Sequence, residues 1–213
     1  EYLYEGATPF TNDLFSMKYQ IFRPYDTKRT EFKLKESIGN VTVYKNTDKT
    51  ALAYAMDDMV KTWDYQDYNP FYVQNDLATS AFDVDELFHM IETEKPKLNN
   101  CKITSDNGDG EYVFENTSAQ PDNMVFTIKS SKARQLYVHF DGSQVENTVI
   151  EKNGEQILTG RLDSQIIYLG NVQKGDVIRI KMQLKQDDVM SGVVRLTAAE
   201  LDEEAMEKLA QKM

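Results

Sequence analysis

The residue types that most often carry chemistry are few and scattered in this sequence. The two histidines, His89 and His139, lie in different segments, and neither has a Cys or Glu at zinc-ligand spacing. The single cysteine, Cys101, cannot form an internal disulfide. No G-x-S-x-G, P-loop or G-x-G-x-x-G motif is present. We therefore predict no catalytic residue, no metal site and no cofactor in this chain.

Acidic residues offer two further kinds of site. The segment Asp106-Asn-Gly-Asp-Gly-Glu111 suggests a calcium loop, but an EF-hand needs oxygen ligands where this segment has Gly108 and Gly110. We predict a turn there. Glycoside hydrolysis needs two carboxyl groups at a defined separation in space, and none of the 35 acidic residues is singled out by the sequence.

The most unusual segment is aromatic and polar at once. After Trp63 the sequence reads DYQDYNPFYVQND over residues 64–76. Aromatic side chains with polar tips suit contacts that are partly exposed to solvent. The candidate ligand or interface residues are Trp63, Tyr65, Tyr68, Asn69, Phe71, Tyr72, Gln74 and Asn75.

Two interpretations of this segment stay open. In the first, Phe71 and Tyr72 fill a small core, while Gln74 and Asn75 satisfy backbone groups and cap the next helix. In the second, the aromatic side chains at positions 63, 65 and 68 form an exposed face for sugar rings or for a membrane domain.

Composition limits the class of protein and its partners. The chain has 213 residues, of which 40% are hydrophobic, so it can bury a substantial core. Its net charge of −11 argues against nucleic acid, and against docking on anionic lipid by charge. No apolar segment approaches the roughly 18 to 20 residues that span a bilayer. Because the chain begins at Glu1 and ends inside a helical pattern, we expect it to be part of a longer protein.

The pattern of the chain changes near residues 94–100, which are polar, contain a proline and lack a period. After this boundary, short strand-like segments alternate with turn signals, which is typical of a sandwich or jelly roll. One of these signals, Asn153-Gly154, suits a type I′ hairpin turn. We predict an α+β fold that is mainly β. A small mixed α+β unit (1–98) is followed by an antiparallel, jelly-roll-like β-sandwich (99–196) and a C-terminal amphipathic helix (197–213).

Three helix starts can be proposed from capping residues. Asn75 is a candidate cap for a short helix over residues 76–82. Asp83-Val-Asp-Glu86 has the spacing of a capping box, which predicts a helix ending near Glu92. Thr197-Ala-Ala-Glu200 has the same spacing and predicts the start of the last helix.

Several segments, in order, resemble the bacterial YfhO family of multi-spanning membrane proteins. In this sequence they read NDLFSMKYQIF, VYKN, ALAYAM, NPFYVQNDL, FDVDELFHMI, IIYLGNVQKGDVIRIKM and LTAAELDEEAMEKLAQKM. Each motif alone is weak, but their order and spacing cover nearly the whole chain. One departure is that the family's region usually continues into more β structure and a last membrane helix, whereas this chain stops at Met213.

The resemblance implies a function for the parent protein. Members of the family resemble polytopic GT-C-type glycosyltransferases, which move sugar from a lipid-phosphate carrier onto cell-envelope polymers such as teichoic acid. In that architecture the catalytic acid lies in a loop between membrane helices near the N-terminus, so no catalytic residue is carried over to this chain. The chain is similar to the large extracellular region near the C-terminus.

Three functional hypotheses follow. The first is a non-catalytic extracellular domain of a membrane glycosyltransferase, which recognises the acceptor or covers the membrane active site. Its partners would be its own transmembrane domain and cell-envelope glycan or teichoic acid, with no nucleic acid. The second is a stand-alone carbohydrate-binding β-sandwich module of a secreted or surface protein. The third is a structural or adhesion-type surface domain.

Overall fold

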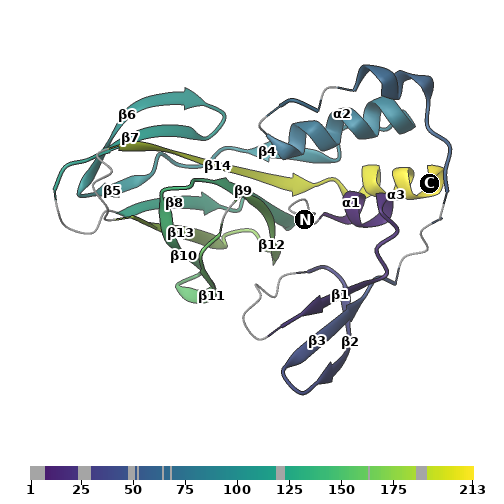
Figure 1. Cartoon of the computed structure of the whole chain (residues 1–213), viewed down its shortest axis with the longest axis horizontal. Helices are drawn as coiled ribbons and strands as arrows, with labels where there is room; N and C mark the ends of the chain where they lie inside the picture. The colour runs from purple at the N-terminus through teal and green to yellow at the C-terminus, as the bar shows by residue number, and fades with distance from the viewer. Residues whose placement is uncertain are drawn as a thin grey trace.

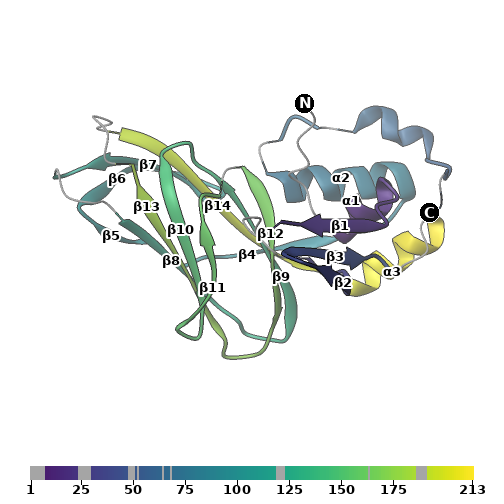
Figure 2. The same ribbon diagram turned by 60° about the horizontal axis from the view of Figure 1, so that its bottom comes forward.

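Two antiparallel sheets packed face to face form the body of the protein (Figures 1 and 2). The structure is a computed structural model, and it describes residues 8–23, 30–47, 51, 53–63, 65–67, 69–118, 123–162, 164–185 and 191–213. Strands predominate, three α-helices lie at one end, and a small third sheet projects from the body (Figure 1). The predicted α+β, mainly β fold with a β-sandwich and a C-terminal helix is confirmed.

The larger sheet has the strand order β12-β9-β14-β7-β6, and β4 also pairs with β14. Strand β14 is long, so it pairs with β7 through residues 191–195 and with β4 through residues 198–201. The strands are β4 (Phe88–Ile91), β6 (Cys101–Gly108), β7 (Glu111–Asn116), β9 (Arg134–Asp141), β12 (Gln165–Val172) and β14 (Ser191–Leu201).

The second sheet of the sandwich has the order β11-β10-β13-β8-β5. Its strands are β5 (Lys97–Asn99), β8 (Asn123–Lys129), β10 (Val145–Lys152), β11 (Glu155–Gly160) and β13 (Val177–Leu184). The predicted Asn153-Gly154 hairpin joins β10 and β11, and both residues have the positive φ that a type I′ turn requires. The main core lies between the two sheets and includes Phe126, Ile150 and Ile180.

Strand β9 has both of its faces buried, because the helices cover the side of the larger sheet that faces away from the sandwich core. Leu136, Val138 and Phe140 point into the main core. Tyr137 belongs to a second cluster, which includes residues of the helices such as Phe71 and Leu209. Residues 136–140 are therefore all buried, without the alternation that a half-exposed strand would show.

The aromatic and polar segment forms a helix of its own. Helix α2 spans Pro70–Phe82 and has Asn69 as its N-cap and Pro70 in its first turn, the position where proline is favoured. The predicted cap at Asn75 is wrong, because Asn75 lies in the middle of this helix. A short 3-10 helix, η1 (Asp58–Thr62), precedes the segment and contacts α2.

The helix expected after Asp83 is a strand instead. Asp83 adopts the left-handed conformation that ends α2, and residues 88–91 form β4 beside β14. The capping-box spacing and the apolar spacing of Leu87, Met90 and Ile91 matched a helix, but pairing with a distant strand decides the structure. This prediction is wrong.

The C-terminal helix exists but begins later than predicted. Helix α3 spans Glu203–Lys212, and the Asp202 side chain caps it by accepting a hydrogen bond from the Ala205 N–H at 2.9 Å. Residues 197–200, expected to be a capping box, are the end of β14. The helix buries Ala205 and Leu209 against the second cluster, as expected of an amphipathic helix.

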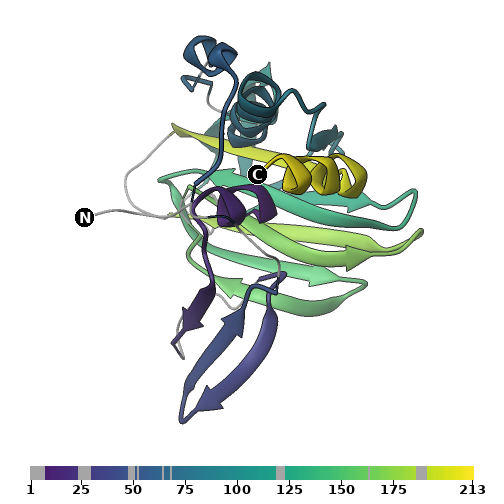
Figure 3. The same ribbon diagram turned by 90° about the vertical axis from the view of Figure 1, so that its right-hand side faces the viewer.

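The N-terminal part adds one short helix and a third sheet. Helix α1 (Pro9–Leu14) is capped by Thr8 in a capping box with Thr11. The sheet has the order β1-β3-β2, with β1 (Tyr19–Phe22), β2 (Lys33–Ile38) and β3 (Val41–Lys45). Figure 3 shows this sheet extending away from the helices and the sandwich.

The division of the chain into domains 1–98, 99–196 and 197–213 stays a prediction. Two observations bear on it: β4, from the first range, pairs with β14 of the sandwich, and the second cluster draws residues from all three ranges.

Candidate functional site

Two of the predicted aromatic residues have structural roles. Phe71 is fully buried, and its ring centroid lies 5.2 Å from that of Phe88. Trp63 is half-buried, packs against the second cluster, and donates a hydrogen bond from its indole N–H to the Val73 carbonyl oxygen at 3.0 Å. Both side chains hold the segment to its own domain.

The three predicted polar residues are buried and satisfy local groups. Asn69 accepts a hydrogen bond from the Phe71 N–H at 3.0 Å, and Gln74 accepts one from the Thr8 hydroxyl at 2.6 Å. Asn75 joins α2 to the start of β4, since its oxygen accepts from the N–H groups of residues 87 and 88 at 3.0 and 2.9 Å. Its amide also donates to the Phe88 carbonyl oxygen at 2.8 Å.

Only part of the predicted face is open to solvent. In the face predicted at positions 63, 65 and 68, Tyr65 is 65% exposed and Trp63 is half-buried, whereas Tyr72, which the other interpretation places in a core, is 38% exposed. Tyr68 lies outside the described residues. The first interpretation therefore agrees with the burial of Phe71 and with the backbone hydrogen bonds of Asn75, but Asn75 caps no helix and Gln74 bonds a side-chain hydroxyl. A binding role for any of these residues stays a prediction.

Tyr72 lines a groove of about 650 Å³ between α2, β4 and the β6–β7 turn. Thr93, Asp106, Asp109 and Tyr112 also line this α2 groove. Burial, followed by the nearby Asp109 carboxylate, raises the pKa of the Tyr72 hydroxyl. The ring therefore stays a neutral hydrogen-bonding group at ordinary pH.

A smaller cavity of about 170 Å³ adjoins the α2 groove and shares Asp109 with it. Asn69, His139 and Arg195 also line this cavity. Burial lowers the pKa of His139 to about 4, so its imidazole is neutral at pH 7.

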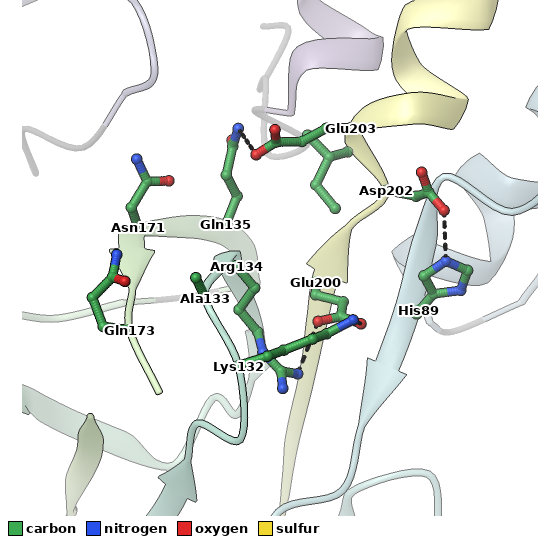
Figure 4. Close-up of a pocket in the computed structure, with 11 residues that line it drawn as sticks. His89, Lys132, Ala133, Arg134, Gln135, Asn171, Gln173, Glu200, Asp202 and Glu203 are labelled. Carbon is green, nitrogen blue, oxygen red and sulfur yellow. Dashed lines mark hydrogen bonds and ion pairs between the residues drawn. The ribbon is translucent and has the colours of Figure 1, made fainter. Parts of the chain in front are cut away.

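A second candidate site lies at the end of the larger sheet, where β9 begins and β12 and β14 end (Figure 4). This β9–β14 cleft has a volume of about 520 Å³. It is lined by His89, Lys132, Ala133, Arg134, Gln135, Asn171, Gln173, Glu200, Leu201, Asp202 and Glu203.

Ion pairs form one wall of the β9–β14 cleft. Arg134 lies 2.9 Å and Lys132 2.7 Å from the carboxylate of Glu200, which is itself largely buried. Figure 4 shows these three side chains together, with His89 and Asp202 beyond them. These two cations are balanced by Glu200 and by Asp202 and Glu203, which line the same cleft.

The His89–Asp202 pair connects β4 to the start of α3, with 3.0 Å between the imidazole Nε2 and the carboxylate. This hydrogen bond raises the pKa of His89. The Ala205 N–H, followed by the hydrogen bond from His89, lowers the pKa of Asp202. The pair therefore favours a charged imidazole in a slightly acidic environment.

Amide side chains form the opposite wall. Gln135 donates to the Glu203 carboxylate at 2.9 Å, and Asn171 pairs with it across β9 and β12, so the two side chains share one face. The side-chain amides of Asn171 and Gln173 make no hydrogen bond to any other described residue. They offer donors and acceptors to a ligand.

The arrangement suits binding of a polyhydroxylated molecule. Amides, carboxylates and cations provide donors and acceptors at many angles, and the volume lies within the range of about 300 to 1,000 Å³ usual for ligand sites. Among the lining residues that the structure describes there is no Ser, Thr, Cys or Tyr. Within the described part of the chain, no cluster of His, Cys, Asp or Glu is arranged to hold a metal ion.

Sequence reasoning did not identify this cleft. Its residues come from β4, β9, β12, β14, α3 and the segments that adjoin them, and pairing between distant strands brings them together. The only signal in the sequence is that polar residues such as Gln135 lie at the ends of predicted strands. That signal is too common to single out a site.

The fold and the cleft define the chain as a β-sandwich domain with a helical layer over one sheet and a polar surface site. Comparison with protein families is more specific. The chain belongs to the family described as bacterial membrane protein YfhO, whose model matches residues 1–213. None of the helices among the described residues has the length and apolar character needed to cross a membrane.

Solved structures similar to this chain cover about half of it. A family 35 carbohydrate-binding module from Clostridium thermocellum is 11% identical with a TM-score of 0.35, over 53% of this chain and 96% of that one. A CBM35 from Paenibacillus barcinonensis is 11% identical with a TM-score of 0.37, over 53% and 100%. The insecticidal crystal protein Cry2Aa is 11% identical with a TM-score of 0.34, over 51% and 21%.

Likeness at this level says nothing about what the chain binds. None of the curated proteins compared with the chain matches it significantly.

Proposed function

We propose that this chain is a non-catalytic domain on the extracellular face of a multi-spanning membrane protein, where it binds the acceptor in sugar transfer onto a cell-envelope polymer such as teichoic acid. The parent would be a lipid-carrier-dependent glycosyltransferase of the GT-C type, and the domain's other partner would be its own transmembrane domain. Membership of a membrane-protein family supports this proposal over a free-standing carbohydrate-binding module.

The observation that carries the proposal is the β9–β14 cleft. The amides of Asn171 and Gln173 face the cleft beside the Gln135–Glu203 pair, with Lys132 at the rim. Sugar hydroxyls both donate and accept hydrogen bonds, so a mixed wall of amides and carboxylates matches them. The chain's net charge of −11 opposes a phosphate-rich polymer, and the cleft itself has three carboxylates against Lys132, Arg134 and one histidine, so contact with the polymer would rest on its sugars more than on its phosphates.

The test is calorimetric titration of the 213-residue chain with two probes, a glucosylated glycerol-phosphate oligomer and a neutral cell-wall disaccharide. We expect binding of the oligomer, and a loss of about 5- to 10-fold in affinity for Gln173→Ala, the usual effect of one hydrogen bond. Gln156→Ala is the matched control, because Gln156 is an exposed amide on β11, away from the cleft.

Equal affinities for Gln173→Ala and Gln156→Ala would remove the cleft from the proposal. If the unaltered chain bound neither probe, acceptor recognition itself would be overturned, and the domain would be left with the role of covering the membrane active site. Stronger loss of binding from Tyr72→Ala than from Gln173→Ala would move the acceptor site to the α2 groove.

A further inference from the structure

The projecting sheet β1-β3-β2 has two faces of different character. In antiparallel sheets, directly paired residues point to the same side. Tyr19, Lys45 and Lys33 are therefore on one face, and Gln20, Tyr44 and Leu34 are on the other. The sheet extends away from the rest of the molecule (Figure 3).

One face turns toward the body of the protein. Gln20 donates a hydrogen bond to the side-chain oxygen of Asn12 in α1 at 3.3 Å. The rings of Phe22 and Tyr44 meet edge to face on this side, with their centroids 5.5 Å apart. These contacts lie on the β1 side of the inner face, whereas Leu34 on its β2 side is 59% exposed.

The other face combines apolar and basic side chains, and we call it the basic hairpin face. Ile21 is 64% exposed, Ile38 is 65% exposed and Tyr19 is 42% exposed. The ammonium group of Lys35 lies 5.1 Å from the centroid of the Tyr19 ring, which places Lys35 on this face. The face consists of Tyr19, Ile21, Lys33, Lys35, Glu36, Ile38, Val41, Val43 and Lys45.

The charge of this sheet is opposite to that of the chain. The three strands contain three lysines (Lys33, Lys35 and Lys45) and one acidic residue, Glu36, which lies 3.6 Å from Lys35, so their net charge is +2, whereas the whole chain has −11. A chain so acidic is repelled by anionic lipid as a whole. The sheet is a local exception, so the molecule can approach such a surface with this face foremost.

Exposed apolar side chains flanked by lysines are the composition of segments that lie in the interface of a membrane. The isoleucine side chains can enter the boundary between headgroups and acyl chains, and the lysines reach the anionic phosphates. Tyrosine is favoured at the same depth. The family to which the chain belongs consists of membrane proteins, so a bilayer lies close to this domain.

We propose that the basic hairpin face rests on the anionic phospholipid surface of the bilayer and sets the orientation of the domain on the membrane. The face binds lipid headgroups by charge and holds the contact with Ile21 and Ile38. This inference is independent of the glycan proposed for the β9–β14 cleft, and either can fail alone.

The test places an environment-sensitive fluorophore on the face through Ile38→Cys, in the full chain with its buried Cys101 replaced by serine. A second labelled variant, Glu155→Cys, reports on the exposed β10–β11 turn. Vesicles contain either phosphatidylglycerol and phosphatidylcholine in equal parts or phosphatidylcholine alone. We expect a blue shift from position 38 only, with the anionic vesicles only, and its loss in about 1 M salt.

Charge variants provide a matched comparison. Replacing both Lys33 and Lys35 with glutamine should reduce partitioning onto the anionic vesicles by about 30-fold, since each lysine near such a surface contributes about 5-fold. Replacing Lys97 and Lys174 with glutamine removes the same charge from the sandwich and should leave partitioning within about 2-fold. Circular dichroism establishes that all variants are folded.

Three results would overturn the proposal. The first is no shift from position 38 with either vesicle, and the second is equal effects of the two pairs of lysine substitutions. The third is a shift that grows with protein concentration without lipid, which would assign the face to a second copy of the chain.

Discussion

His139 makes the stability of this protein sensitive to acid. Its side chain is buried on β9, where it pairs with Thr197 of β14, and burial lowers its pKa to about 4. In the unfolded chain a histidine titrates near pH 6.5. Between these two pH values the unfolded state binds a proton that the folded state does not, so the free energy of unfolding falls as the pH decreases.

We predict that His139→Gln removes this dependence. Between pH 7 and pH 4 the unaltered protein should lose about 2 to 3 kcal/mol that the variant keeps, as measured by urea unfolding at both pH values. His89→Gln is a control, because the contribution of His89 to stability changes with pH in the opposite direction. Because the pKa of His89 is raised, its contribution is present below pH 6.5 and is lost as the pH rises through its folded pKa. Parallel pH profiles for the protein and His139→Gln would contradict the prediction.

For single residues, the sequence predicts what kind of role a side chain has more reliably than it predicts which group the side chain contacts. One of the two interpretations of the segment has Gln74 and Asn75 satisfy backbone groups; Asn75 does so, whereas Gln74 bonds the Thr8 hydroxyl. The groups that Asn75 satisfies belong to residues 87 and 88, whose position depends on pairing between β4 and β14. No local pattern in the sequence indicates that β4 pairs with β14. The cap predicted for Asn75 was wrong because α2 already begins at Pro70.

Among the elements, the β6–β7 turn is held against β14. Gly110 has a φ of +77°, its carbonyl oxygen accepts a hydrogen bond from the Leu196 N–H at 3.0 Å, and a Cβ built on it would overlap the Leu196 carbonyl oxygen. Gly154 has a similar φ of +87° in the β10–β11 turn, but a Cβ there has nothing within 4 Å. The two glycines have similar φ angles and differ in whether an added Cβ would meet a neighbouring strand.

This difference predicts unequal effects of the same substitution. Gly154→Ala should destabilise the protein by about 1 to 2 kcal/mol, the usual penalty of a positive φ for an L-residue. Gly110→Ala should cost at least about 2 kcal/mol more, because β14 or the turn must move. Thermal unfolding of both variants measures the difference. Equal shifts in Tm would show that the turn moves away from β14 freely.

Elements with local signals were predicted well, and elements fixed by distant partners were not. The strands flanking Asn153-Gly154 were identified because the turn and the apolar alternation both lie within one short segment. Strand β4 and the end of β14 were taken for helices, since their apolar spacing and capping residues are compatible with either structure. Their pairing joins residues more than a hundred positions apart, and this pairing also builds the β9–β14 cleft.

For the whole molecule, the central question is whether the two core clusters form one cooperative unit. They share the larger sheet: Leu136 of β9 belongs to the main core and its neighbour Tyr137 to the second cluster. Opening either cluster exposes one face of the same strand. We therefore expect the sandwich and the helical layer to unfold together, even though the sequence predicts a boundary at residue 98.

The chain has one natural reporter for each cluster. Trp63, the single tryptophan, packs against the second cluster, and Cys101, the single cysteine, is buried in the main core. In a urea series, the change in Trp63 fluorescence and the reaction of Cys101 with a thiol reagent should share one midpoint, as a two-state transition requires. If Trp63 changed at lower urea while Cys101 stayed protected, residues 1–98 would form a separate unit that docks β4 onto a sandwich already stable without it.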